Sequence, residues 1–297
     1  MTDVSGLVTW RALWGETAAV LGDRNHARWM CEVASGLDGA EFLARLDEPA
    51  MHSMVAHLDS MIERRRLGEP LQYVLGRWQF RRLDLMVDNR VLIPRPETEW
   101  VCEAAIAIAR SLLSPLTSPS SAPSRLQIAD LGTGSGAIGL SLAAELPPGS
   151  ADLWLADVSA DALDVARANL TGIGPSAQWV RVVQGWWFSA LPAELQLTMD
   201  LVVANPPYIA IGDGAIETDV SRWEPHVALF SGDDGLHDIR IIASDAAEWL
   251  RPGGYLVIEI GADQGGQVRE ILTDAHFTDV EIRADLAGRD RIAIARR

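Results

Sequence analysis

Residues 200–208 read DLVVANPPY, an apolar, β-branched run that leads directly into Asn205, Pro206, Pro207 and Tyr208. Such a run is typical of a buried strand. Each proline has a fixed φ and no N–H, and a residue before a proline is held extended. Both Asn205 and Pro206 are therefore expected to be extended, so the strand should end in a stiff turn with a defined direction.

The end of this predicted strand offers a pair of hydrogen-bond acceptors. The side-chain carbonyl of Asn205 and the backbone carbonyl of Pro206 can point out of the strand end together, where a carboxamide or an exocyclic amine has two N–H donors to meet them. Tyr208 supplies a flat apolar face beside the group so held. A plain strand-ending turn is the alternative, since Asn and Pro are common in turns. We favour a clamp for a planar NH₂ group, with Asn205, Pro206 and Tyr208 as catalytic residues, because a glycine-rich loop lies upstream.

The glycine-rich loop follows another predicted strand, at 126–131. It reads Gly132-Thr133-Gly134-Ser135-Gly136-Ala137. This pattern fits G-x-G-x-G and also the G-x-G-x-x-A of a dinucleotide site, and its glycines let a ligand approach the backbone closely. Asp157, which ends the next strand, could accept hydrogen bonds from ribose hydroxyls in either case. The structural alternative is a tight strand-to-helix turn with an N-cap aspartate.

Asp130, two residues before the first glycine, discriminates between these cofactors. A carboxylate would repel a pyrophosphate but suits the cationic methionine end of S-adenosylmethionine. The NH₂ clamp favours the same cofactor, because hydride transfer needs no such clamp. Trp186, Trp187 and Phe188 follow the next strand. One indole could cover the adenine ring, or these aromatics could be ordinary core at the edge of the sheet.

Predicted strands and helices alternate from residue 126 onward. Besides the strand before Asn205, strands are expected at 126–131, 153–157, 180–184, 255–260, 280–284 and 291–295, and helices at 138–145, 160–170, 238–250 and 264–275. This alternation implies a parallel, doubly wound sheet. Ligands bind beyond the carboxyl ends of the strands in such sheets.

Residues 1–76 are expected to form a small helical domain. Apolar residues recur at helical spacing in four segments, at 10–21, 24–35, 39–46 and 51–62. Their Trp and Met stripes are typical of core. Arg64-Arg65-Arg66 indicates a solvated helix end rather than a nucleic-acid patch. Alternating apolar residues then predict a hairpin at 77–93, which links this domain to a catalytic domain at 94–297.

The linker leads into Leu92-Ile93-Pro94-Arg95-Pro96-Glu97-Thr98-Glu99. Two prolines bracket Arg95, so the segment should be stiff and should fix where Arg95 and Glu97 point. Thr98 and the acids could equally begin the next helix, and both interpretations can hold at once. Residues 114–124, rich in Ser and Pro, are expected to form a flexible surface loop.

The totals exclude several classes of protein. The 297 residues favour about two domains, and the net charge of −16 argues against a dedicated duplex-binding surface. The two cysteines, Cys31 and Cys102, match no metal spacing and indicate a reducing compartment. No signal peptide and no apolar run of membrane-spanning length is evident, so we expect a cytoplasmic protein without bound metal.

Taken together, these residues resemble the peptide chain release factor N(5)-glutamine methyltransferases, also called the HemK or PrmC family. The matching stretches are residues 68–73, 92–99, 130–136, 205–209, 224–229, 234–236, 252–254, 259–261 and 285–291. The glycine loop is shared with many methyltransferases and Asn-Pro-Pro-Tyr with DNA adenine and ribosomal methylases. The stretch at 92–99 is the discriminating one.

The resemblance implies a class I S-adenosylmethionine-dependent methyltransferase with a Rossmann-like, seven-stranded sheet. A small N-terminal helical domain for substrate docking and a β-hairpin linker precede it. The implied cofactor contacts are Asp130, Gly132, Thr133, Gly134, Ser135, Gly136, Asp157, Trp187 and Asn205. The implied substrate contacts are Asn205, Pro206, Pro207, Tyr208, Arg95 and Glu97. The substrate would be the glutamine of the Gly-Gly-Gln motif in bacterial-type release factors. We expect a monomer that contacts neither nucleic acid nor membrane.

One residue departs from the family pattern, and three alternatives stay open. The family position before the Trp-Phe pair is often acidic, but here it is Trp186, which affects the expected adenine contact. The first alternative is a DNA or RNA amino-methyltransferase acting on a flipped adenine. The second is glutamine methylation of a ribosomal protein. The third is a module that holds the cofactor without turnover.

Overall fold

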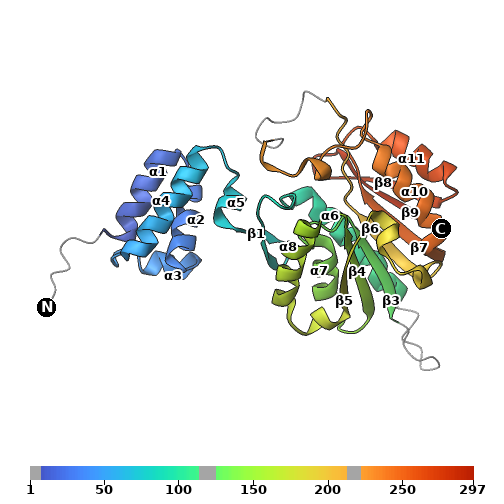
Figure 1. Ribbon diagram of the computed structural model, residues 1–297, viewed down its shortest axis with the longest axis horizontal. Coiled ribbons are helices and arrows are strands. Elements are labelled where there is room, and N and C mark those ends of the chain that lie inside the picture. The colour runs from blue at the N-terminus through green and yellow to red at the C-terminus, as the bar shows by residue number, and fades with distance from the viewer. Residues whose placement is uncertain (1–7, 114–124, 213–221) are drawn as a thin grey trace. The chain divides into compact units, whose positions relative to one another are not determined.

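The computed structural model describes residues 8–113, 125–212 and 222–297. The chain divides into two compact units, Met1–Arg77 and Trp78–Arg297 (Figure 1). The expected Ser/Pro loop at 114–124 lies outside the described residues. Within the part of the chain that is described, no helix has the length and apolar character to cross a membrane.

The first unit consists of helices with well-defined ends. They are α1 (Trp10–Leu21), α2 (Arg24–Ser35), α3 (Gly39–Ala44), α4 (His52–Arg66) and α5 (Leu71–Leu75). Asp23 begins α2 by accepting hydrogen bonds from two backbone N–H groups, and Gly22 and Gly36 end α1 and α2 with φ of 70°. The predicted bounds of α1 and α2 are confirmed. The sequence pattern does not predict α5, and α3 ends two residues earlier than expected.

The apolar stripes of this unit form its core, as predicted. Trp10, Met30, Phe42, Leu58 and Met61 belong to one buried cluster. The rings of Trp10 and Phe42 pack edge to face with centroids 6.0 Å apart. These large residues therefore hold the helices together.

A short hairpin opens the second unit. Its strands are β1 (Arg77–Phe80) and β2 (Leu83–Met86). The predicted hairpin at 77–93 is therefore too long, since residues 87–95 contain no strand. Asn169 joins the hairpin to the glycine loop: its Nδ2 donates to the carbonyls of Met86 and Ser135, at 3.0 and 2.9 Å, and its Oδ1 accepts from the Met86 N–H.

The main sheet has seven strands in the order β5-β4-β3-β6-β7-β9-β8. Their bounds are β3 (Leu126–Leu131), β4 (Ala151–Asp157), β5 (Val180–Gln184), β6 (Met199–Ala204), β7 (Leu250–Glu259), β8 (Thr278–Ala284) and β9 (Asp290–Arg296). The expectation of a parallel sheet is wrong for β9, which runs antiparallel to β7 and β8. Only a short turn joins β8 to β9, and a parallel connection would need a long crossover.

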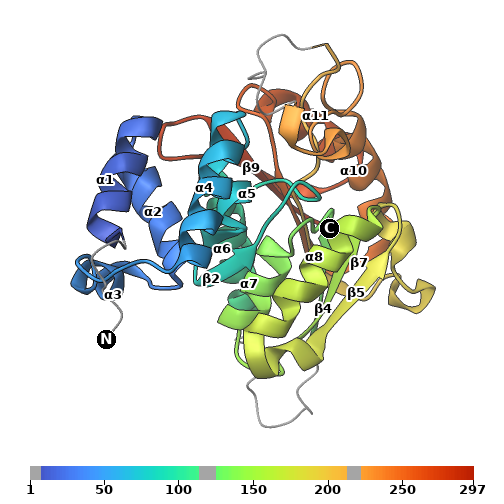
Figure 2. The ribbon, with the colours of Figure 1, turned by 60° about the vertical axis from the view of Figure 1, so that its left-hand side comes forward.

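Helices cover both faces of this sheet. They are α6 (Pro96–Leu113), α7 (Ala137–Glu145), α8 (Ala160–Leu170), α10 (His237–Trp249) and α11 (Gly265–Asp274), with the 3₁₀ segments η2 (Thr171–Trp179), η3 (Trp187–Ala190), η4 (Ala193–Leu195) and η5 (His226–Ala228). Helix α7 packs against β4 and α8 against β5, whereas α10 contacts β7 (Figure 2). Helix α8 has the predicted bounds, and Ser159 caps its start by accepting from the Ala162 N–H.

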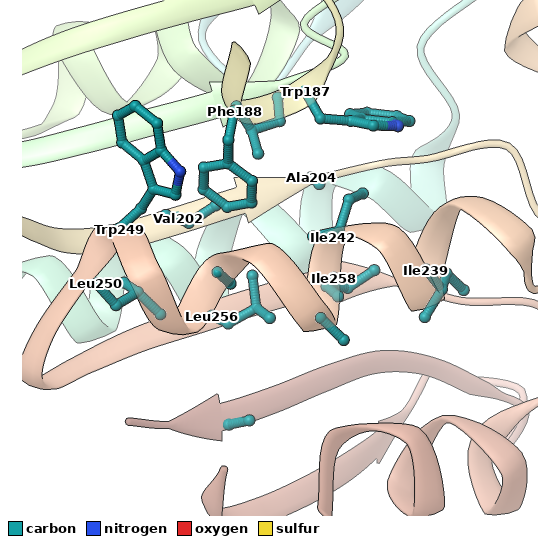
Figure 3. Packing of buried hydrophobic residues seen from close by; sticks show 14 of the residues in the cluster. Trp187, Phe188, Val202, Ala204, Ile239, Ile242, Trp249, Leu250, Leu256 and Ile258 are labelled. Carbon is teal, nitrogen blue, oxygen red and sulfur yellow. The ribbon is translucent and has the colours of Figure 1, made fainter. Parts of the chain in front are cut away.

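One face of the sheet packs against α10 through a large apolar cluster (Figure 3). Val202 and Ala204 alternate along β6 toward this cluster, where Ile242 of α10 meets them. The rings of Phe188 and Trp249 stack with centroids 5.7 Å apart. Strand β6 is buried along its whole length because both its faces are covered. The apolar run at 200–204 is therefore the buried strand that the sequence predicts, and Phe188 is core.

Candidate active site

A cavity lies beside the carboxyl ends of β3, β4 and β6. The strand order reverses between β3 and β6, because β4 and β5 continue on one side and β7 on the other. Open α/β sheets bind ligands at such a reversal. The cavity therefore occupies the position that the fold favours for a ligand.

The cavity brings together most of the residues that the sequence singles out. Those in its lining are Asp130, Gly132, Thr133, Gly134, Ser135, Asp157, Trp186, Trp187, Asn205 and Pro207. The other predicted site residues are outside this lining: Arg95, Glu97, Gly136, Pro206 and Tyr208. Segments from four strand ends and from the stretch before α6 thus meet at one place.

The glycine loop needs its glycines for two different reasons. Gly132, Gly134 and Gly136 all have positive φ, at 70°, 54° and 86°, a conformation that other residues adopt with strain. A Cβ on Gly132 would lie 3.0 Å from the Trp187 ring, and one on Gly136 would lie 2.7 Å from Leu140. Gly132 therefore allows the indole to pack on the loop, whereas Gly136 allows α7 to begin.

Asp130 is buried, and only one of its two carboxylate oxygens accepts hydrogen bonds in the described structure. Its Oδ2 accepts from the Thr133 hydroxyl at 2.6 Å and from the Gly139 N–H at 2.8 Å, while its Oδ1 has no partner in the described structure. Burial raises the pKa of this carboxyl to about 6, and its two hydrogen bonds act against that rise. An unpaired carboxylate oxygen in a ligand cavity is a ready acceptor for a cationic donor.

Asp157 shapes the cavity from the neighbouring strand. One carboxylate oxygen accepts from the Gly134 N–H and the other from the Ser159 N–H, both at 2.9 Å. Burial raises its pKa, opposed by these backbone hydrogen bonds. Asp157 thus holds the glycine loop against the start of α8. Each of its oxygens keeps a second lone pair for a ligand hydroxyl.

The two tryptophans after β5 have different surroundings. Trp187 is buried, and its Nε1 donates to Asp238 Oδ1 at 3.2 Å. Asp238 is itself held by the Ser231 hydroxyl at 2.6 Å. Trp186 is 44% exposed and packs edge-on against Trp187, with centroids 5.7 Å apart. Trp187 is therefore fixed in the cavity wall, while Trp186 presents an open indole to the cavity.

The Asn205 side chain is held by its nitrogen. Its Nδ2 donates to the Thr98 hydroxyl at 3.3 Å. Among the described residues, no donor reaches Asn205 Oδ1, and no N–H reaches the carbonyl of the buried Pro206. Asn205 is half-buried and lines the cavity, whereas Pro206 is buried and lies outside the lining. That these two oxygens together hold a substrate amide stays a prediction.

Tyr208 lies next to a buried acid. Its hydroxyl is 3.5 Å from Oε1 of Glu259, which ends β7, and burial raises the pKa of Tyr208 to about 12. Its backbone carbonyl accepts from Gln264 Nε2 at 3.0 Å, so the turn is held in place from α11. The Tyr208 hydroxyl is therefore a neutral group throughout the physiological range.

Arg95 and Glu97 both form ion pairs within the second unit. Arg95 Nη2 donates to Glu224 Oε1 at 2.5 Å, and the other oxygen of Glu224 accepts from the Ile93 N–H. Glu97 pairs with Arg289 at 3.3 Å, in the turn between β8 and β9. These contacts fasten the stretch at 92–99 beside the cavity. The predicted start of a helix there is also confirmed, because α6 begins at Pro96.

Four further residues support the site, although sequence reasoning gives none of them a role. They are Thr98, Glu224, Asp238 and Glu259. All four side chains are buried. Glu259 ends a buried apolar strand just as Asp130 does, and that signal could have identified it. The others act through contacts distant in sequence, which no local pattern reveals.

Comparison with known proteins identifies similar chains. Family models for the PrmC N-terminal domain and for the methyltransferase small domain match residues 16–76 and 107–221. A release factor glutamine methyltransferase from Xylella fastidiosa is 39% identical over 259 residues, covering 87% of this chain and 88% of the relative. One from Moorella thermoacetica is 40% identical over 271 residues, covering 91% and 88%.

Solved structures share the fold of this chain at low sequence identity. A human methyltransferase 10 domain containing protein superposes with a TM-score of 0.50 at 18% identity, covering 72% of this chain and 88% of that one. The delta-N METTL16 methyltransferase domain superposes with a TM-score of 0.53 at 20% identity, covering 80% and 95%. Both neighbours are methyltransferases by name.

Proposed function

Because this chain belongs to the family of release factor glutamine methyltransferases, we propose that it methylates the side-chain amide nitrogen of a release-factor glutamine with S-adenosylmethionine. The chain is a methyltransferase enzyme with the class I fold. The glutamine is that of the Gly-Gly-Gln motif in bacterial-type release factors, and the reaction takes place in the cytoplasm. The first unit docks the substrate protein.

The pair of open acceptors at the end of β6 carries this proposal. Asn205 Oδ1 and the Pro206 carbonyl have no donors among the described residues, and Asn205 lines the cavity. A primary carboxamide offers two N–H donors on one planar nitrogen, which matches two neighbouring acceptors. Pro207 and Tyr208 bound the same turn, so an apolar wall stands beside the bound amide.

The cavity residues fit S-adenosylmethionine. Asp130 Oδ1 is buried without a partner and suits the cationic methionine end, while Asp157 keeps lone pairs for the ribose hydroxyls. Trp186 and Trp187 add aromatic surface to the lining of the same cavity. When bound, the cofactor supplies an electrophilic methyl group. Asp130 and Asp157, which would hold the cofactor, line the same cavity as Asn205 of the clamp.

The clamp explains how a poor nucleophile can react. The lone pair of a carboxamide nitrogen is delocalised into its carbonyl. Acceptance of both N–H hydrogens by Asn205 and Pro206 raises electron density on the nitrogen and aims it along the line of transfer. Orientation supplies most of the catalysis, and the preorganised acceptors stabilise positive charge that develops on nitrogen. The N-protonated product is strongly acidic, so it loses its proton afterwards without a dedicated base.

Methylation of purified substrates tests the proposed reaction. The enzyme and labelled S-adenosylmethionine are incubated separately with a release factor, with DNA and RNA, and with ribosomal proteins. Mass spectrometry then locates the methyl group. We expect one methyl on the side-chain nitrogen of the Gly-Gly-Gln glutamine. Label in nucleic acid or in a ribosomal protein alone would replace the proposal with one of those functions, and binding without transfer would indicate a cofactor-holding module.

Tyr208→Phe is expected to retain activity to within about tenfold, because the hydroxyl makes only one long hydrogen bond, worth about 1 kcal/mol. The ring, which provides the apolar wall, is unchanged by this substitution. Steady-state rates of release-factor methylation measure the effect. Tyr208→Ala serves as the comparison, since it removes the wall as well. A thousandfold loss in Tyr208→Phe would show that the hydroxyl takes part in the chemistry.

A further inference from the structure

Glu259, at the carboxyl end of β7, is a buried acid that has no role in the proposed reaction. It is 1% exposed, and its Oε2 has no partner in the described structure. Burial of a carboxylate oxygen without a partner destabilises the folded state. Two of its neighbours belong to the clamp or contact it: Tyr208, whose hydroxyl is 3.5 Å from Glu259 Oε1, and Thr98, whose hydroxyl lowers the pKa of the Glu259 carboxyl.

Thr98 connects Glu259 to the clamp. Its oxygen accepts from Asn205 Nδ2 at 3.3 Å, so its own hydrogen must go elsewhere. Glu259, a buried acid with an unpartnered oxygen and a pKa that the Thr98 hydroxyl lowers, is the acceptor that we assign to this hydrogen. An ionised carboxylate can only accept hydrogen bonds, so it fixes the direction of the whole chain from Asn205 through Thr98 to Glu259. Asn205 must then present its oxygen, and not its NH₂ group, to the substrate.

We propose that Glu259 is a positioning residue that, acting through Thr98, holds the Asn205 amide with its oxygen toward the substrate glutamine. This inference rests on the proposed function and adds a determinant that lies outside the cavity lining. A protonated Glu259 can donate to Thr98 Oγ1 and so reverse the chain. Thr98 would then donate to an Asn205 amide turned the other way. The clamp would offer an NH₂ group to a substrate that brings only donors.

The charges around Glu259 make this reversal accessible to experiment. Burial raises its pKa to about 7, and Glu97 of α6 adds to the rise. Arg291 of β9, the Thr98 hydroxyl and the Tyr208 hydroxyl act in the opposite direction. Since the folded pKa lies above the usual 4.5, the ionised, acceptor-only form is present above about pH 7 and is lost as the pH falls through that value. Methyl transfer should therefore slow on acidification.

Single-turnover rates of release-factor methylation, with cofactor and substrate both saturating, test this role from about pH 5.5 to 8.5. The wild-type rate should fall as the pH is lowered through about 7. Glu259→Gln should transfer methyl groups about tenfold more slowly at high pH, and its rate should not fall further on acidification. Its KM for the release factor and its Kd for S-adenosylhomocysteine should stay close to the wild-type values. These last two readouts distinguish positioning from a general loss of structure.

Thr98 provides a matched pair of variants that leaves the Glu259 side chain itself unchanged. Thr98→Val removes the hydroxyl at constant shape and should reproduce the slow rate, whereas Thr98→Ser keeps the hydroxyl and should be near wild type. The double variant Glu259→Gln/Thr98→Val should be no slower than Thr98→Val alone, because both changes break one chain. If Glu259→Gln fails to fold, the Thr98 pair decides the question.

Three outcomes would overturn the inference. Glu259→Gln could keep the wild-type rate and pH dependence, it could change only KM for the release factor, or the losses in rate could be additive in the double variant. A wild-type enzyme that transfers no methyl group to a release factor would overturn the proposed function, and this role with it. An active wild type with unaffected variants would remove only the role of Glu259.

Discussion

Replacement of Asn205 by alanine is expected to lower the single-turnover rate of methyl transfer by about a thousandfold or more, while cofactor binding stays measurable. The substitution removes one of two acceptors for the substrate amide and the only side chain of the clamp. Asp130 and Asp157, which we propose hold the cofactor, are fixed by hydrogen bonds to the glycine loop and α7 that do not involve Asn205. Rapid-quench assays with labelled S-adenosylmethionine measure the rate, and calorimetry measures cofactor affinity.

Asn205→Asp is the informative companion variant. Its carboxylate still offers an oxygen to the substrate, but it cannot donate to Thr98 as the Asn205 Nδ2 does. It should therefore retain more activity than Asn205→Ala and less than the wild type. Thermal unfolding of both variants serves as the control for folding. Methylation by Asn205→Ala at a wild-type rate would refute the clamp.

The second large effect is expected from Asp130→Asn, which should weaken binding of S-adenosylmethionine by roughly 100-fold. The amide oxygen can still accept from Thr133 and Gly139, as Oδ2 does now. The amide NH₂ would occupy the place of the unpaired Oδ1 and would face the cationic end of the cofactor. The fold should thus persist while the charge-assisted contact is lost.

The same carboxyl should make cofactor binding depend on pH. Its pKa is raised to about 6, so wild-type affinity should increase as the pH rises through that value and the carboxylate forms. Asp130→Asn should lack this dependence. Asp152→Asn is the matched control: Asp152 lies on β4, pairs with Arg125 at 2.8 Å and does not line the cavity. Equal affinity loss in both variants, or an unchanged pH profile in Asp130→Asn, would contradict the proposed contact.

The sequence predicts those parts of the fold that local chemistry determines. Capping residues fix helix ends, so Asp23 and Gly36 bound α2 and Ser159 begins α8 where expected. A buried strand followed by two prolines identifies the end of β6. The pattern of apolar residues does not determine the direction of a strand, however. The antiparallel pairing of β9 with β7 therefore emerges only from the structure. Likewise, β7 begins at Leu250, five residues before its apolar run makes a strand evident.

The residues of the candidate site likewise fall into two groups, those that the sequence predicts and those that only the structure reveals. Asp130, Asp157 and Asn205 end or follow apolar strands, and the topology brings such ends together. Thr98 and Glu259 come together only through the packing of α6 on the sheet, across more than 150 residues of chain. The sequence therefore reveals which groups line the cavity, whereas the groups that orient them emerge from tertiary structure.

A crystal structure of the enzyme with S-adenosylhomocysteine and a Gly-Gly-Gln peptide tests the clamp most directly. We expect the glutamine side-chain nitrogen to lie within hydrogen-bond distance, about 2.7–3.2 Å, of both Asn205 Oδ1 and the Pro206 carbonyl, and to face the cofactor sulfur. A bound glutamine whose nitrogen contacts neither oxygen would contradict it, provided that the same enzyme and peptide give methyl transfer with S-adenosylmethionine in solution.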